Sequence, residues 1–147
     1  MKLFAAAAAV VGGVAAMSMN TPATAHHAFS AEFDADLPVA LRGPITRVEW
    51  INPHSWIHLE HTNDDGSTQA WMAEGGTPNT LLRRGITRNS LQIGTEIVVT
   101  GYQSKDQLCS PACRANGRDI TFPDGRKLFM GSSGTGAPDD GADPTEG

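Results

Sequence analysis

The chain has few cysteines, tyrosines and basic residues, and it lacks the common catalytic and nucleotide-binding motifs. It has two cysteines and one tyrosine among 147 residues, and only 11 Lys and Arg against 16 Asp and Glu. A net charge of -5 repels phosphate backbones and anionic lipid surfaces, so nucleic acid is not the expected partner. No Ser-His-Asp spacing, phosphate loop or dinucleotide fingerprint is present. The sequence therefore favours a binding protein over an enzyme and leaves catalysis open.

Long hydrophobic runs are also missing. The longest apolar stretch, residues 3–17, is interrupted by Gly12-Gly13 and is shorter than the roughly 20 residues that a bilayer requires. It is followed by Ala23-Thr24-Ala25, the small-x-small pattern of a signal peptidase site. We therefore expect residues 1–25 to be a signal peptide and the mature chain to be periplasmic or secreted, without membrane insertion after cleavage.

The two cysteines, Cys109 and Cys113, are separated by three residues. An oxidising compartment favours a disulfide between them, which would constrain the unfolded chain by roughly 2 kcal/mol. A soft-metal or redox pair is the alternative, because closely spaced cysteines also chelate metals and exchange disulfides.

Alternating apolar residues predict an all-β domain over 26–130, with an N-terminal arm before the first strand. The pattern slips by one residue after Gly43-Pro44, which indicates a bulge. A short helix is expected around residues 81–84, capped by Thr77 or Asn79 and stopped by Gly85. The expected strands are 39–50, 55–61, 68–72, 96–102, 115–122 and 127–130.

Three strands, one short helix and two or more further strands is the order of an OB-like Greek-key barrel, here with five to six strands. A β-sandwich is the alternative. Residues 131–147 contain no aromatic or large aliphatic side chain and are expected to form a disordered acidic tail.

Histidine supplies the candidate chemistry. Cleavage after Ala25 would give His26 a free amine beside its imidazole, a chelate suited to copper, with His27 adjacent. His54, in the turn Asn-Pro-His, is the proposed third ligand. A frayed terminus without metal is the plainer interpretation of His26 and His27.

Two other histidines are not expected to join that site. On a strand, His54 and His58 would stand about 13 Å apart, and His58 and His61 would face opposite sides of the sheet. Trp50 and Trp56 are either packing residues or a face that binds an unknown protein or small organic molecule. No cofactor other than copper is expected.

The chain resembles a family of small exported bacterial proteins classed as a domain of unknown function. The resemblance covers about 100 residues and is carried by the following segments: 26–29, 32–34, 48–50, 52–54, 81–85, Leu91, Gly94, 101–102 and 124–126. It implies an all-β exported domain and gives weight to His26, His27 and His54. The Cys109–Cys113 segment and the acidic tail depart from the family pattern.

Overall fold

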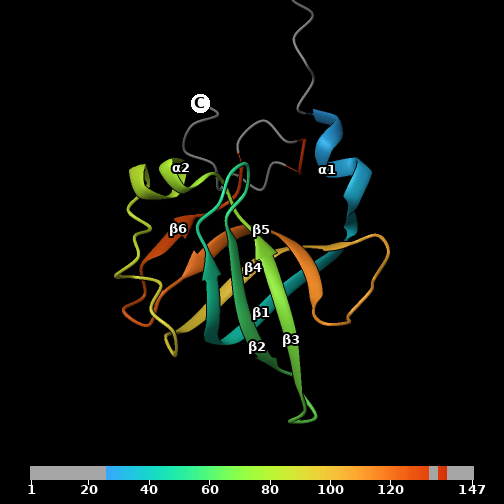
Figure 1. Cartoon of the computed structure of the whole chain (residues 1–147). Helices are drawn as coiled ribbons and strands as arrows, with labels where there is room; N and C mark the ends of the chain where they lie inside the picture. The colour runs from blue at the N-terminus through green and yellow to red at the C-terminus, as the bar shows by residue number, and fades with distance from the viewer. Residues whose placement is uncertain (1–25, 133–135, 139–147) are drawn as a thin grey trace, which may run out of the picture.

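The structure is a computed structural model that describes residues 26–132 and 136–138, with side chains from residue 29 onward. It consists mainly of antiparallel strands with two short helices, which confirms the all-β prediction (Figure 1). The elements are α1 (His26–Glu32), β1 (Phe33–Glu49), β2 (Trp56–Thr62), β3 (Thr68–Glu74), α2 (Pro78–Arg83), β4 (Glu96–Ser104), β5 (Cys113–Thr121) and β6 (Lys127–Phe129).

The sheet closes on itself. Its strand order is β3-β2-β1-β4-β5-β6, and an additional parallel pairing joins β3 to β5. The long strand β1 makes this possible, because its first part pairs with β4 and its last part with β2. With α2 between β3 and β4, the arrangement is the barrel-like, OB-like fold that the sequence predicts.

Close approach between strands explains two glycines. A Cβ atom at Gly43 would lie 1.9 Å from the Glu60 carbonyl oxygen, and one at Gly101 would lie 2.0 Å from that of Asn116. Neither position therefore accommodates a side chain. The predicted bulge is confirmed: the register of β1 with β2 shifts between Ile45 and Arg47.

The barrel interior holds the core. Inward-facing aliphatic residues of five strands are buried, and each large one contributes about 1.5–3 kcal/mol of apolar burial. Leu81 of α2, Ile86 and Met130 are buried with them although they lie outside the strands, and the largest buried strand residues are Leu41, Ile45, Ile57, Leu59, Ile97, Val99 and Ile120. Because side chains alternate along a strand, the residues between them face outward.

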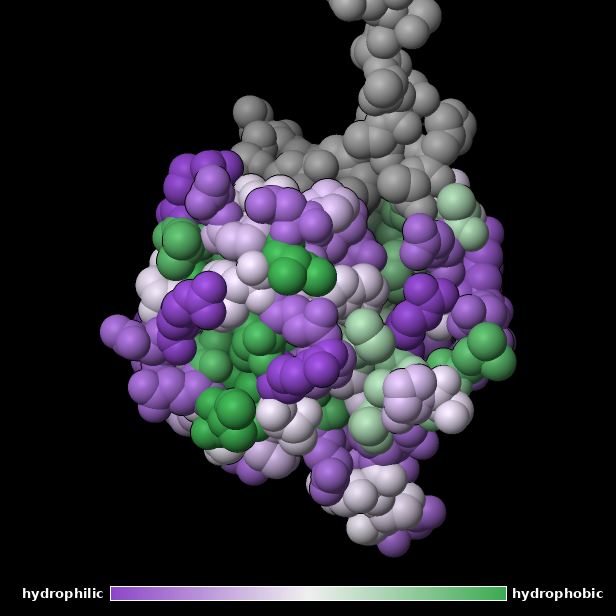
Figure 2. All heavy atoms as spheres, viewed as in Figure 1, coloured by the Kyte–Doolittle hydropathy of each residue, from purple (hydrophilic) through white to green (hydrophobic). Residues whose placement is uncertain are grey.

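Some apolar residues remain at the surface. Figure 2 shows apolar residues in separate places interspersed with polar residues, more of them on the side of the molecule that carries α2. The large exposed ones are Ile51, Leu82, Ile93 and Leu108. Isolated residues of this kind are normal on soluble proteins and assign no ligand.

The sequence predicts one of the two helices but not the other. The Thr77 hydroxyl caps α2 by accepting a hydrogen bond from the Thr80 amide at 3.2 Å, and Gly85 follows with φ of +84°, as predicted. Helix α1 was not predicted; the sequence suggested an arm and one helix only. Seven residues have weak intrinsic helicity, and contacts of Phe29 with Phe33 and Tyr102 hold the helix against the barrel.

Both predicted terminal segments lie largely outside the described residues: all of 1–25, and 133–135 and 139–147 of the tail. The described tail residues contact the domain. Arg84 Nη1 donates to the Gly131 carbonyl at 2.5 Å, and Arg118 Nη2 donates weakly to that of Pro138 at 3.5 Å. Within 26–132 and 136–138, neither helix has the length and apolar character needed to cross a membrane.

Candidate functional site

A row of outward-facing residues crosses four strands near one end of the barrel. Glu49 on β1 pairs with Trp56 on β2, Trp56 pairs with Glu74 on β3, and Glu74 pairs with Asn116 on β5. Although they face away from the core, Glu74 and Asn116 are only 8% and 2% exposed. This part of the outer surface is therefore covered.

The loop between β1 and β2 brings His54 to that row. The Ser55 amide donates to the Gly76 carbonyl at 3.0 Å, and the Gly75 amide donates to the Ser55 carbonyl at 2.8 Å. These two bonds fix the loop to the segment that follows β3. The sequence placed His54 at a turn, and the structure adds the buried carboxylate of Glu74 beside it.

His54 and Glu74 form a loose pair. His54 Nδ1 lies 3.6 Å from Glu74 Oε1, which is an ion-pair distance too long for a hydrogen bond, and 3.3 Å from Ser132 Oγ. Among the described residues, Nε2 of His54 has no hydrogen-bond partner. The side chain is 35% exposed, so this nitrogen is the one available to a ligand.

Glu74 sits in surroundings that resist its ionisation. Burial raises the pKa of Glu74 above its ordinary value, and the nearby Glu32 carboxylate adds to the rise, whereas His54, Arg114 and a hydrogen bond from Asn116 oppose it. The Asn116 side chain also leaves its Oδ1 buried without a partner. His54, Glu74 and Asn116, which we call the His54 site, thus offer more acceptors than the fold supplies with donors.

Helix α1 ends beside the His54 site. Arg114 Nη1 lies 3.8 Å from Glu32 Oε2, and the Lys105 amide donates to the Glu32 carbonyl at 2.9 Å. A helix of seven residues spans about 10 Å, which is the distance along the axis between Glu32 and the start of the helix at His26. Figure 1 shows α1 and the β1–β2 loop at the same end of the barrel.

The structure brings His54 and Glu74 together, but it does not place the side chains of His26 and His27, which lie outside those described. Among the described residues, three or more His, Cys, Asp or Glu side chains do not come together in a way that could hold a metal ion.

A second histidine–carboxylate pair lies on the outer face of β1 and β2. His58 Nε2 is 2.8 Å from Glu49 Oε1, and Arg47 also pairs with Glu49. Burial works to raise the pKa of Glu49, but the hydrogen bond from His58 and the Arg47 charge outweigh it and lower that pKa. His61 has a different partner, since its Nδ1 accepts from the Arg42 amide at 3.0 Å.

The tryptophans have different surroundings. Trp50 packs against the core and carries the Arg88 guanidinium 5.0 Å above its ring. Trp56 is half-buried on the outer face of β2, and Trp71 is buried in the core. Trp50 and Trp56, the predicted ligand face, therefore lie just after the end of β1 and at the start of β2.

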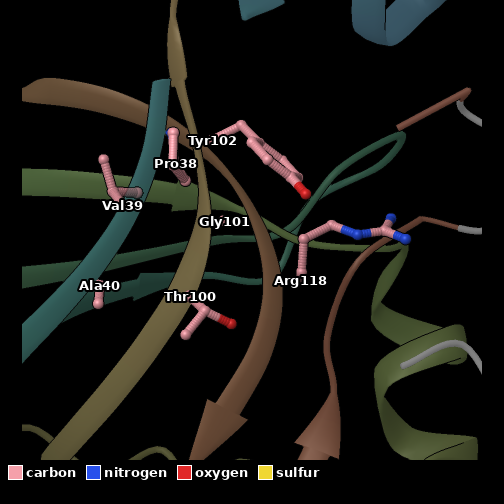
Figure 3. Close-up of a pocket in the computed structure, with 7 residues that line it drawn as sticks. All are labelled: Pro38, Val39, Ala40, Thr100, Gly101, Tyr102 and Arg118. Atoms are coloured by element: carbon pink, nitrogen blue, oxygen red, sulfur yellow. The ribbon is translucent and has the colours of Figure 1, made fainter. Parts of the chain in front are cut away.

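Sequence reasoning missed a cavity of about 340 Å³ between β1 and β4 (Figure 3). Its lining residues are Pro38, Val39, Ala40, Thr100, Gly101, Tyr102 and Arg118. Arg118 is only 4% exposed, and its guanidinium lies 4.7 Å above the Phe129 ring. In Figure 3 that guanidinium points away from Pro38, Val39 and Ala40, so the cavity itself has a largely apolar wall.

The cysteine prediction is confirmed. Cys109 and Cys113 are joined by a disulfide, and Cys113 begins β5 with its side chain in the core. The bridge thereby ties the loop after β4 to the strand that carries Arg114 and Asn116.

Comparison with known proteins identifies one family. A model described as a family of unknown function, DUF6152, matches residues 14–110, about two thirds of the chain. The chain belongs to this family. The matched part of this DUF6152 protein extends from before α1 through β4 and includes His54 and Glu74, whereas Asn116 lies beyond it. No curated protein matches the chain.

Proposed function

We propose that this DUF6152 protein is an exported module that binds a transition-metal ion, copper above all, through His54 and the histidines at its mature N-terminus. The observation that carries the proposal is the His54–Glu74 pair. His54 keeps Nε2 available on a partly exposed ring, and its other nitrogen faces a buried carboxylate.

That arrangement is typical of metal-binding histidines. A ligating imidazole usually has a carboxylate or carbonyl behind its second nitrogen, which fixes the ring and increases its basicity. A metal ion at Nε2 would withdraw electrons from the ring and strengthen the Nδ1–H donor. Closing the present 3.6 Å separation from Glu74 into a hydrogen bond would then stabilise both groups.

The charges around His54 favour a cation. Glu74 and Glu32 bring two carboxylates to this end of the barrel, and the unpartnered Oδ1 of Asn116 adds an acceptor. Arg114 offsets part of this charge, but it is itself paired with Asp106 at 3.0 Å as well as with Glu32.

The remaining ligands would come from the N-terminus. If a signal peptidase cuts after Ala25, the amine and imidazole of His26 form a chelate, and α1 starts about one helix length from Glu32 at the border of the site. The disulfide suits an oxidising compartment outside the cytoplasm. Export and cleavage at this bond are part of the proposal.

The test uses mature protein with His26 as its first residue, confirmed by mass spectrometry. Cu(II) is titrated by electron paramagnetic resonance and by competition with a chelator. We expect one site with nitrogen hyperfine splitting, and a loss of affinity of about 10- to 100-fold in His54→Ala. An added glycine before His26 should cause a similar loss because it removes the amine from the chelate.

His61→Ala is the matched control, since His61 is also partly exposed on this domain but accepts a backbone hydrogen bond elsewhere. Its Cu(II) affinity should equal that of the unmodified protein. Equal binding by His54→Ala, or by the protein with the added glycine, would contradict the proposed ligand set.

A further inference from the structure

We propose a second, separate metal site on the outer face of the β2–β3 hairpin, where His58 and Met72 would bind a soft monovalent cation of the Cu(I) type. It uses none of the ligands of the His54 site. Strand register, the partners of His58 and the chemistry of a thioether support this site.

The register places the two ligands side by side. His58 on β2 pairs directly with Met72 on β3, so their Cβ atoms are about 4.5–5.5 Å apart. Both face outward, because the neighbouring Ile57 and Ala73 are buried in the core, and both are half-buried. Trp56, the next outward residue of β2, lies diagonal to Met72.

The tautomer of His58 is set by Glu49. An ionised carboxylate only accepts hydrogen bonds, so the 2.8 Å contact favours the neutral ring with its proton on Nε2; the Arg47 guanidinium, which can only donate, lies farther from that nitrogen at 3.4 Å. The lone pair is then on Nδ1, which has no hydrogen-bond partner among the described residues. Glu49 contacts the second nitrogen of this imidazole, as a carboxylate commonly does for a metal-binding histidine.

Met72 decides which ion fits. Thioether sulfur is a soft donor that selects Cu(I) over hard cations such as Mg²⁺ or Ca²⁺. The other methionine among the described residues, Met130, is fully buried in the core. Both cysteines are in the disulfide, so no thiol of this chain competes for a soft ion.

The surroundings tolerate a single positive charge. Two arginines flank the pair in the same cross-strand row, Arg47 on β1 and Arg114 on β5. Arg47 is paired with Glu49, and Arg114 is paired with Asp106 and Glu32. The Trp56 ring, next in line on β2, adds an aromatic face of the kind that attracts cations.

The experiment titrates the purified protein with Ag(I), a redox-inert substitute for Cu(I), in chloride-free buffer. Calorimetry measures the affinity, and the methyl signals of ¹³C-methyl-methionine report the sulfur. We expect the Met72 methyl signal, assigned by its absence in Met72→Leu, to shift on binding. Met72→Leu and His58→Ala should each weaken Ag(I) binding by about tenfold or more.

Two control variants separate this site from other sites. Met130→Leu replaces the buried methionine, and His54→Ala disables the His54 site; both should keep the Ag(I) affinity at Met72. An unshifted Met72 signal in the unmodified protein, or unchanged affinity in Met72→Leu, overturns the proposal. Loss of Ag(I) binding in His54→Ala alone would assign the ion to the His54 site instead.

Discussion

Two histidine–glutamate pairs on the same barrel have opposite electrostatics. Glu49 meets His58 at 2.8 Å, and its pKa is lowered, whereas Glu74 lies 3.6 Å from His54, and its pKa is raised. The side chain of Glu49 is 27% exposed and that of Glu74 is 11% exposed. For Glu49, two close charged or ionisable donors outweigh the cost of burial, whereas for Glu74 a hydrogen bond from Asn116 and a more distant histidine do not.

The Glu49 carboxylate has its partners within the protein, whereas the His54 site contains a buried acceptor without a donor. Glu49, His58 and Arg47 satisfy one another, so that pair can act as the fixed support of a ligand at the free nitrogen. Asn116, the hydrogen-bond partner of Glu74, keeps its Oδ1 buried without a donor, a state that costs free energy unless a donor or cation arrives. The two sites are proposed for different ions because the site at His58 includes the soft thioether of Met72.

The largest expected effect is on stability and comes from replacing Ile57, a core residue of β2. Ile57 lies between Trp56 and His58 and is fully buried, so Ile57→Ala should lower the free energy of unfolding by about 2–5 kcal/mol, measured by urea denaturation. The shape of its pH dependence should stay the same because neither pair loses a partner. Ile93→Ala, at an exposed position, is the control and should change it by less than about 0.5 kcal/mol.

Reducing the disulfide should loosen the region near the His54–Glu74 pair but not the region around the His58–Glu49 pair. The bridge closes a short loop, and its loss should cost about 2 kcal/mol in the presence of a reductant. Because Cys113 precedes Arg114, which holds Glu32, amides of α1 should exchange faster, while those around Glu49 and His58 should not. The Cys109→Ala, Cys113→Ala double variant should no longer respond to reductant; equal acceleration in both regions would contradict this local coupling.

Much of the fold follows from local sequence. Alternation of apolar residues, the Thr77 cap and the glycine at position 85 each act over a few residues, and their predictions agree with the structure within a few positions. Helix α1 could not be predicted from local sequence, because it is held by an aromatic contact with Tyr102, about 70 residues later in the chain. Strand β1 was also predicted too short, since its first part is defined by pairing with β4.

In the candidate sites, too, some features follow from local sequence and others depend on contacts between distant parts of the chain. His54 could be chosen from the turn that contains it, but the local sequence gives no partner for Glu74. Its closeness to His54 depends on hydrogen bonds of Ser55 with Gly75 and Gly76. The pairing of His58 with Met72 depends on the register of β2 with β3 and could not be read from either strand alone.

Replacing the buried carboxylate should stabilise the protein. Because the pKa of Glu74 is raised above 4.5, stability falls as pH rises from about 4.5 through that raised pKa, and Glu74→Gln does not titrate. At pH 7 the variant should be more stable by about 1 kcal/mol, since glutamine is neutral and can donate to Asn116 Oδ1. The advantage should vanish below pH 4.5; a variant less stable at pH 7 would mean that attraction to His54 exceeds the cost of burial.

Glu49→Gln should have the opposite sign and the smallest effect. The pKa of Glu49 is lowered below 4.5, so its pairing contributes stability that is complete above pH 4.5 and is lost as pH falls through the lowered pKa. The variant should be less stable at pH 7 by about 0.5 kcal/mol, and 1 M salt should shrink the difference because the pair is partly exposed. If Glu49→Gln were instead stabilising at pH 7, as expected for Glu74→Gln, close donors would not be what distinguishes the two glutamates.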